Sequence, residues 1–300
     1  MATPSVSSLV DGQLPPFFTE SWFDFYSRNG MCRETLERFR TIIFHHYLHH
    51  RRDFSWREEI SPYRVLVSEV MLQQTQTSRV VPVFERFIGA LPDFRSLAGA
   101  PFAEVLGLWK GLGYNRRARY LQETAVRVIG EHDGILPDSP DVLVTFPGIG
   151  PATAASICVF ACNQPLVFIE TNIRTVFLHF FFPGETAVHD RRIMPLVERT
   201  LEVERPRDWY YALMDYGVLL KRIVGNAGRR SSHYHRQSPF AGSDRQLRGR
   251  ILQQLLDCQL VEAADLAPLL GEPSARVDRL VDALCDEGLV VRNGTVLALD

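Results

Sequence analysis

Apolar residues recur at the spacing of an amphipathic helix along most of the chain. One apolar stripe, at i, i+3, i+4, i+7 and i+8, is formed by Tyr63, Leu66, Val67, Val70 and Met71. The pair Ser61-Pro62 before it is typical of a helix start. The same periodicity predicts further helices over residues 33–50, 78–90, 102–108, 115–131, 139–145, 152–162, 172–181, 190–201 and 206–220. Because short Gly/Pro turns separate these segments and no alternating strand pattern occurs before residue 285, this part is predicted to be all-α.

The end of the chain has a different pattern. Residues 246–257, 263–270 and 274–287 indicate three short helices, with Gly271 as a C-cap and Pro273 opening the third. Asn293-Gly294 lies between β-branched residues and predicts a hairpin over 289–297. Three helices and a hairpin resemble a winged-helix module of the α+β class. We therefore expect an N-terminal extension (1–30), a helical domain (31–240) ending in a loop over 221–240, and a winged-helix-like module (244–300).

Composition indicates a folded protein outside membranes. With 46% hydrophobic and 23% charged residues, the 300-residue chain can bury a full core. It contains no run of eighteen uncharged apolar residues and no signal-peptide pattern at its start, so a cytoplasmic location is the expectation. The five cysteines are scattered without a CxxC pair, which argues against disulfides and a zinc site.

The net charge of −2 hides an uneven distribution. Between residues 221 and 250 there are eight lysines and arginines and one acid, Asp244. A local basic segment is typical of a contact with the DNA backbone, although a solvated loop has the same composition. From residue 251 onward there are nine acidic residues and three arginines, so the C-terminal module suits packing or protein contact as well as DNA binding. Lys110 and Lys221 are the only lysines.

A glycine-containing turn precedes one predicted helix. The segment Phe146-Pro147-Gly148-Ile149-Gly150-Pro151 places two glycines at the mouth of the helix over 152–162. Without side chains there, backbone N–H groups can approach a phosphate closely, and the helix dipole favours the anion. The turn therefore predicts a phosphate contact.

Several motifs together resemble one known family. They are Ser68-Glu69-Val70-Met71-Leu72-Gln73-Gln74-Thr75-Gln76, then Leu108-Trp109-Lys110-Gly111-Leu112-Gly113-Tyr114 followed by Arg116-Arg117-Ala118-Arg119, the hairpin, and flanking Trp56-Arg57 and Ala212-Leu213-Met214-Asp215-Tyr216-Gly217. In this order they resemble the helix-hairpin-helix DNA glycosylase superfamily, and within it the MutY-type adenine glycosylases. The resemblance covers about residues 35–220. It implies an all-α, two-lobed glycosylase fold and base excision from duplex DNA after base flipping.

The resemblance also implies two catalytic carboxylates. Glu69 matches the family's general acid. A purine leaves as an anion unless a ring nitrogen is protonated, and a carboxyl group in an apolar pocket can donate that proton near neutral pH. The family's second carboxylate, an aspartate that stabilises the sugar cation or activates the nucleophile, is replaced here by Glu170. Either the pocket has adjusted to the longer side chain, which we favour, or the activity is altered or lost. Asn172 matches the asparagine that positions the sugar.

Three further departures follow from the same comparison. Bifunctional relatives such as endonuclease III place a strand-cutting lysine where this chain has Ala152, so a monofunctional enzyme without AP-lyase activity is expected. The four cluster cysteines of most relatives fall on Lys221, Gly228, Ser231 and Gln237, so no [4Fe–4S] cluster is expected, and the basic run over 229–236 is expected to replace the cluster loop's phosphate contacts. The C-terminal tail is expected to be too short for the Nudix-like domain with which most relatives inspect 8-oxoguanine, which leaves recognition of the opposite base open.

The remaining site predictions concern DNA contacts and the base pocket. The residues expected on DNA are Gln73, Gln74, Thr75, Tyr114, Gly148, Ile149, Gly150, Arg229 and Arg230. The expected base-pocket residues are Trp56, Arg57, Leu72, Ala152 and Tyr211. The resemblance adds a monovalent cation held by hairpin carbonyls. A nucleoid-associated monomer that excises adenine opposite 8-oxoguanine or guanine is the leading hypothesis. The alternatives are a glycosylase for another base, a non-catalytic mismatch or abasic-site binder, and a transcription regulator.

Overall fold

The computed structural model describes residues 20–234 and 239–300, and these form two compact units. Unit 1 comprises Met1–Phe54 and Ala155–Arg236, and unit 2 comprises Ser55–Ala154 and Gln237–Asp300. The predicted domain over 31–240 thus contributes to both units, and the module over 244–300 belongs to unit 2. The predicted extension before residue 20, and residues 235–238 of the predicted basic loop, lie outside the described residues.

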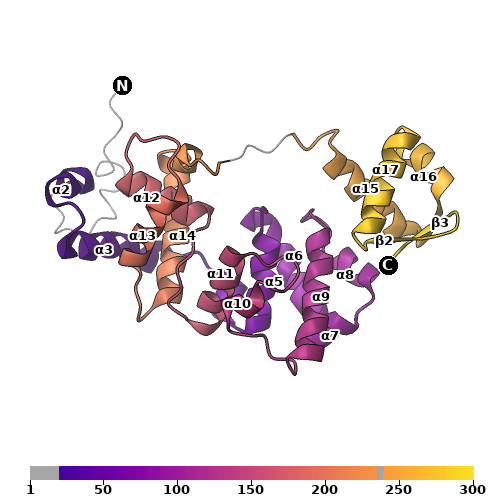
Figure 1. Ribbon diagram of the computed structural model, residues 1–300, viewed down its shortest axis with the longest axis horizontal. Coiled ribbons are helices and arrows are strands. Elements are labelled where there is room, and N and C mark those ends of the chain that lie inside the picture. Colours follow the sequence, from indigo (N-terminus) through magenta and orange to yellow (C-terminus); the bar gives the residue numbers. More distant parts are fainter. Residues whose placement is uncertain (1–19, 235–238) are drawn as a thin grey trace. The chain divides into compact units, whose positions relative to one another are not determined.

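Unit 1 is a helical bundle made from two distant stretches of chain. Its helices are α2 (Trp22–Asn29), α3 (Arg33–His50), α12 (Thr171–Phe181), α13 (Asp190–Thr200) and α14 (Pro206–Ile223), with the 3₁₀ turn η1 (Ala227–Arg230). Helix α14 packs against both α3 and α12 (Figure 1). Phe39 is fully buried at the centre and contacts the rings of Phe177, Phe180, Phe181 and Trp209.

The part of the predicted N-terminal extension that the structure describes contains a helix that packs into unit 1. Helix α2 begins after Ser21, whose side chain accepts a hydrogen bond from Asp24 N. Trp22 and Phe25 are buried, and Trp22 Nε1 donates to Phe180 O at 2.8 Å. The prediction of a separate extension is therefore wrong for residues 22–29. These residues show no period long enough to detect, and their burial depends on residues about 160 positions later in the chain.

Unit 2 contains the remaining helices and the sheet. Its first part has α4 (Ser55–Glu58), α5 (Pro62–Leu72), α6 (Thr77–Ala90), α7 (Phe94–Gly99), α8 (Phe102–Leu108), α9 (Arg116–Glu131) and α10 (Pro140–Leu143). Helix α11 (Pro151–Cys162) crosses from unit 2 to unit 1. The C-terminal part has α15 (Asp244–Cys258), β1 (Leu260–Glu262), α16 (Ala263–Leu270), α17 (Ser274–Asp286), β2 (Val290–Asn293) and β3 (Val296–Leu299).

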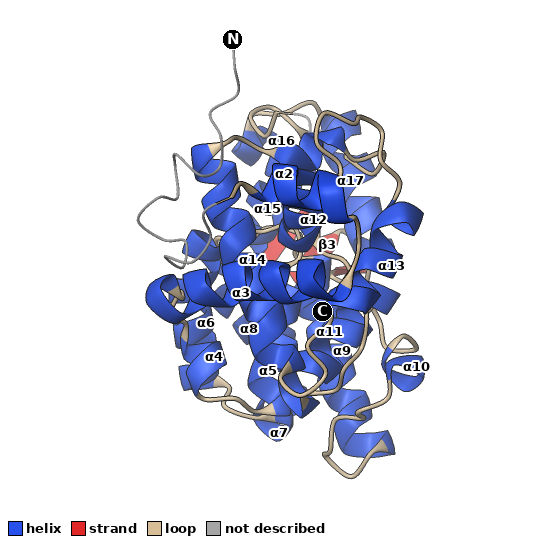
Figure 2. Ribbon diagram, turned by 90° about the vertical axis from the view of Figure 1, so that its left-hand side faces the viewer, coloured by secondary structure: helices blue, strands red, loops and turns tan. Residues whose placement is uncertain are grey.

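Strands occur only in the C-terminal part of the described chain (Figure 2). They form an antiparallel sheet in the order β1-β3-β2. Strand β2 pairs with β3 in the predicted hairpin, with Asn293 opposite Val296. Strand β1 was not predicted, because it is too short to show alternation. The predicted fold class, an all-α glycosylase fold with a winged-helix-like module, is confirmed.

The described helices include none that is long and apolar enough to cross a membrane.

Candidate active site

The hairpin over 146–150 has the backbone geometry that its sequence predicts. Phe146 and Ile149 are buried and anchor the turn, whereas Gly148 and Gly150 are exposed just before α11. Gly148 has φ +72°, and a Cβ added there would lie 2.6 Å from Cδ2 of Tyr120. Only glycine fits this position without strain. The helix start is therefore open for an anion.

Helix α5 carries Glu69 and ends in the turn that carries the predicted DNA contacts Gln73, Gln74 and Thr75, which we call the wedge residues. Ser61 caps its start by accepting a hydrogen bond from Arg64 N at 3.2 Å. Glu69 is half-buried beside Ser68 and Val70, which are buried. Beyond the helix, Gln74 has φ +54° and is exposed.

Gln73 connects this turn to the hairpin. Its Nε2 donates to Gly148 O at 3.2 Å and lies 3.4 Å from Thr153 Oγ1. The two segments predicted to touch DNA are therefore held together by side-chain hydrogen bonds. The monovalent cation expected at the hairpin stays a prediction.

The guanidinium of Arg117, on α9, fixes the end of α5. It donates to the carbonyl oxygens of Val70, Met71 and Gln73 at 2.8, 2.9 and 2.6 Å. It also donates to Thr75 Oγ1 and to Gly113 O, both at 3.0 Å.

Burial lowers the pKa of Arg117 to about 10, so the side chain stays charged at neutral pH. Sequence analysis placed Arg117 in a family motif but did not assign it a role. A buried arginine in a chain rich in exposed ones has no distinguishing sequence signal.

Four predicted DNA contacts line one cleft of about 730 Å³ in unit 2: Gln73, Gln74, Tyr114 and Gly148. Tyr114 has φ +49°, is 38% exposed, and accepts a hydrogen bond from Arg245 Nη1 at 3.1 Å. Phe240, also in the cleft, is 60% exposed. The basic side chains lining the cleft are Arg79, Lys110, Arg116, Arg117, Arg245 and Arg248. Exposed aromatic rings among cations suit a nucleic-acid strand.

Some of these cations are neutralised within the protein. Arg116 Nη2 lies 2.7 Å from Glu287 Oε1, and Arg248 also pairs with Glu287. Residues of α15 and of the loop before it line the same cleft as the wedge residues. Helix α15 belongs to the C-terminal module, for which packing, protein contact and DNA binding were all left open.

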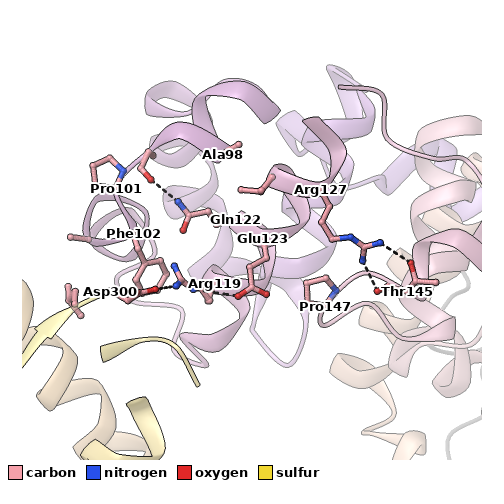
Figure 3. Close-up of a pocket in the computed structure, with 14 residues that line it drawn as sticks. Ala98, Pro101, Phe102, Arg119, Gln122, Glu123, Arg127, Thr145, Pro147 and Asp300 are labelled. Atoms are coloured by element: carbon pink, nitrogen blue, oxygen red, sulfur yellow. Dashed lines mark hydrogen bonds and ion pairs between the residues drawn. The ribbon is translucent and has the colours of Figure 1, made fainter. Parts of the chain in front are cut away.

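A larger pocket of about 1010 Å³ in unit 2 is a poorer candidate (Figure 3). None of the predicted site residues lines it. Its polar side chains bond to the protein: Gln122 donates to Ala100 O at 2.7 Å, Arg127 donates to Thr145 O at 2.8 Å, and Arg119 pairs with Asp300.

The second predicted carboxylate, Glu170, lies in unit 1 as the N-cap of α12. Its Oε1 accepts hydrogen bonds from Asn172 N at 2.6 Å and Ile173 N at 2.8 Å. Its Oε2 accepts from Asn172 Nδ2 at 3.2 Å. The structure thus brings together the two predicted side chains, although glutamate is a less common N-cap than aspartate.

Opposing effects act on the charge of Glu170. Burial raises the pKa of its carboxyl group above the ordinary value. The backbone N–H groups of Ile173 and Asn172 and the charges of Lys221 and Arg174 lower it. The net direction is upward, so the ionised form depends on these neighbours.

Comparison with known proteins gives the family. A model described as the HhH-GPD superfamily of base excision DNA repair proteins matches residues 67–201. An adenine DNA glycosylase from Mycolicibacterium smegmatis is 35% identical over 81% of this chain and 89% of the relative. The chain belongs to the adenine DNA glycosylase family of this superfamily. A second member, from Mycobacterium tuberculosis, is 32% identical over 82% of this chain and 88% of the relative.

Solved structures give the same fold. A thermostable thymine-DNA glycosylase has a TM-score of 0.56 and 25% identity, and the match covers 62% of this chain and 87% of that chain. An endonuclease III trapped in a covalent intermediate with DNA has a TM-score of 0.50 and 19% identity, covering 71% and 92%, and this likeness shows the fold alone.

In this member of the adenine DNA glycosylase family, residues at the positions of the cluster cysteines of most relatives make other contacts. A Cβ at buried Gly228 would lie 2.8 Å from Asn226 Oδ1 and 3.1 Å from Thr175 Oγ1. Ser231 is buried, and its Oγ accepts from His233 N at 3.0 Å. Gln237 lies outside the described residues. The described residues at these positions offer no thiolate, and the absence of a cluster stays a prediction.

The two arginines of this segment differ. Arg229 is exposed, in keeping with its predicted DNA contact. Arg230 donates to Leu178 O at 2.7 Å and to Phe182 O, at the C-terminus of α12. Its guanidinium is thus engaged with carbonyl groups that the helix leaves unpaired, and its DNA contact stays a prediction.

The predicted base-pocket residues fall in different environments. Trp56 is buried against Phe84 at a centroid distance of 5.0 Å, and Tyr211 stacks on Phe160 at 4.6 Å. The other three are more accessible: Arg57 and Leu72 are half-buried, and Ala152 is exposed. Their role as a base pocket stays a prediction.

Proposed function

We propose that this chain is a monofunctional glycosylase that removes adenine paired with 8-oxoguanine or guanine in duplex DNA. The observation that supports it most is the Glu170 carboxylate held on the N-terminus of α12 by Asn172, in a member of the adenine DNA glycosylase family. Relatives with this name match the chain over most of its length.

The proposed mechanism divides the work between two carboxyl groups. The hairpin amides and the cationic cleft hold the duplex backbone while the target nucleotide leaves the base stack. Glu69 in its protonated form donates a proton to a ring nitrogen of adenine, so that the base departs as a neutral molecule. Ionised Glu170 stabilises the positive charge that develops on the sugar, and water then completes hydrolysis.

Two proposed absences complete this function. Ala152 stands at the position of the strand-cutting lysine of bifunctional relatives, so treatment with borohydride is expected to trap no covalent complex with DNA. Without cysteines at the cluster positions, the purified protein is expected to contain no iron. A trapped complex, or stoichiometric iron with cluster absorbance, would contradict these statements.

A single-turnover assay tests the function. Duplexes carry adenine opposite 8-oxoguanine, adenine opposite guanine, or other damaged bases, and the proteins are wild type, Glu69→Gln, Glu170→Gln and Glu185→Gln. Glu185 is an exposed glutamate paired with Arg192 in unit 1, and therefore a matched control. Adenine release that only the first two substitutions abolish supports the proposal.

Other outcomes lead elsewhere. Release of a different base would assign a different substrate, which the replacement of the family aspartate by Glu170 favours as the second candidate. Binding of every duplex without any release would refute the enzymatic function and leave a DNA-damage binding protein.

A further inference from the structure

Lys221, in the last turn of α14, contacts the side chain that positions Glu170. Its Nζ donates to Asn172 Oδ1 at 2.6 Å. The same amide donates through Nδ2 to Glu170 Oε2 at 3.2 Å. The three side chains therefore form a hydrogen-bonded chain from ammonium through amide to carboxylate.

The approach of α14 to α12 makes this contact possible. Gly217 lies one helical turn before Lys221, and a Cβ at Gly217 would lie 2.5 Å from Asn172 O. The missing side chain lets the helices approach, so that the half-buried lysine reaches the amide.

Hydrogen-bond chemistry fixes the orientation of the amide. A lysine ammonium only donates, and an ionised carboxylate only accepts. Asn172 must therefore point Oδ1 toward Lys221 and Nδ2 toward Glu170, as observed. Without the ammonium, one end of the amide loses its partner, and its orientation is specified only by Glu170.

Neighbouring cations are compensated by other carboxylates. Arg52 Nε donates to Asp215 Oδ1 at 2.7 Å, and Arg174 forms two hydrogen bonds with Asp190 at 2.8 and 2.6 Å. Both arginines lower the pKa of Lys221, as does burial, which is the largest cause, whereas Glu170 raises it. Lys221 and Arg174 are the charged groups that lower the pKa of Glu170.

We propose that Lys221 is a positioning residue for Glu170, because its ammonium fixes the amide of Asn172, which in turn donates to the carboxylate. The catalytic purpose of this arrangement rests on the proposed function, but the contacts themselves do not. Lys221 touches neither the base nor the sugar in this account.

The first test is independent of activity. Carboxyl signals of ¹³C-labelled glutamate are titrated in wild type, Lys221→Met, Lys221→Arg and Arg222→Met, and Glu170→Gln identifies the signal of Glu170. Arg222 is the adjacent, exposed cation of α14 and serves as the matched control. Loss of a nearby positive charge raises a carboxyl pKa. We expect Lys221→Met to raise the pKa of Glu170, and the two other variants to change it little.

The second test is the pH dependence of single-turnover adenine release at saturating protein. In Lys221→Met, the acid limb of the profile is expected to move to higher pH and the rate at pH 7 to fall about tenfold or more, with duplex affinity unchanged. Lys221→Arg is expected to restore most of the rate, and Arg222→Met is expected to lose much less of the rate than Lys221→Met. Thermal unfolding of each variant identifies a loss that comes only from misfolding.

The outcomes separate the two proposals. An unchanged Glu170 titration in a folded Lys221→Met protein would overturn the positioning role, whatever the activity. A higher Glu170 pKa in Lys221→Met than in wild type, found in a protein whose wild type releases no base, would uphold the positioning role and refute the proposed function. Equal rate losses in Lys221→Met and Arg222→Met would show a general charge effect and overturn the specific role of Lys221.

Discussion

Replacing Glu170 by aspartate restores the residue that the family pattern has at this position, and we expect the change to impair the enzyme. The carboxylate oxygens accept hydrogen bonds from Asn172 N and Ile173 N at 2.6 and 2.8 Å, with the longer side chain already seated on the helix. Aspartate lacks one methylene, so its carboxylate would lie about 1 Å away, a displacement that costs about hundredfold in rate. That factor corresponds to about 2.7 kcal/mol of transition-state stabilisation.

Stability is expected to respond differently from rate. Aspartate is a preferred N-cap, so α12 should remain capped and the melting temperature should not fall. The assay is single-turnover adenine release by Glu170→Asp beside thermal unfolding, with Glu185→Asp as the exposed control. A Glu170→Asp protein that is as fast as wild type, or faster, would refute the inference that the site has adjusted to glutamate.

Three further predictions concern residues that support the site. Arg117→Met should lower the free energy of unfolding by about 3 kcal/mol, because several carbonyl groups lose a charged donor, and it should also slow base release. A change below about 1 kcal/mol in urea unfolding would contradict this role. Gly217→Ala should destabilise the folded protein by about 1 to 3 kcal/mol, because the new Cβ would clash with backbone atoms of Asn172. The control is Gly249→Ala, in a helix with open space around the glycine, which should be neutral or stabilising. Burial lowers the pKa of His179 from 6.5 to about 4, so between these pH values the unfolded chain binds a proton that the folded chain does not. Stability should therefore fall as the pH drops from about 6.5 toward 4. Between pH 7 and pH 5, the free energy of unfolding should fall less in His179→Leu than in wild type, and equal decreases would refute this assignment.

Several helices could be predicted from the sequence to the residue. The predictions over 33–50, 102–108 and 263–270 coincide with α3, α8 and α16. Three short elements, α4, α7 and β1, could not be predicted, because each spans too few residues to show a period and no motif marks it as a helix or strand. Helix α2 was missed for a related reason: Trp22 becomes a core residue only through partners in α3 and α12.

The candidate site was predictable in part. Glu69, Glu170 and Asn172 could be selected because a motif surrounds them, and the structure joins the last two by hydrogen bonds. The roles of Arg117 and Lys221 could not be predicted, because each depends on acceptors contributed by a segment at least forty residues away. Sequence distance hides such contacts unless the packing of the helices is known.

The composition of unit 1 from two stretches has a consequence for synthesis on the ribosome. Its first stretch, Met1–Phe54, emerges long before the second, Ala155–Arg236. Trp22 donates to Phe180 O and Arg40 to Thr200 O, across 158 and 160 residues of chain. Helices α2 and α3 therefore leave the exit tunnel without their partners, and their apolar faces stay uncovered while the whole of 55–154 is translated. Until α14 is synthesised, the nascent chain exposes the apolar faces of α2 and α3, and such exposed surface is what chaperones bind.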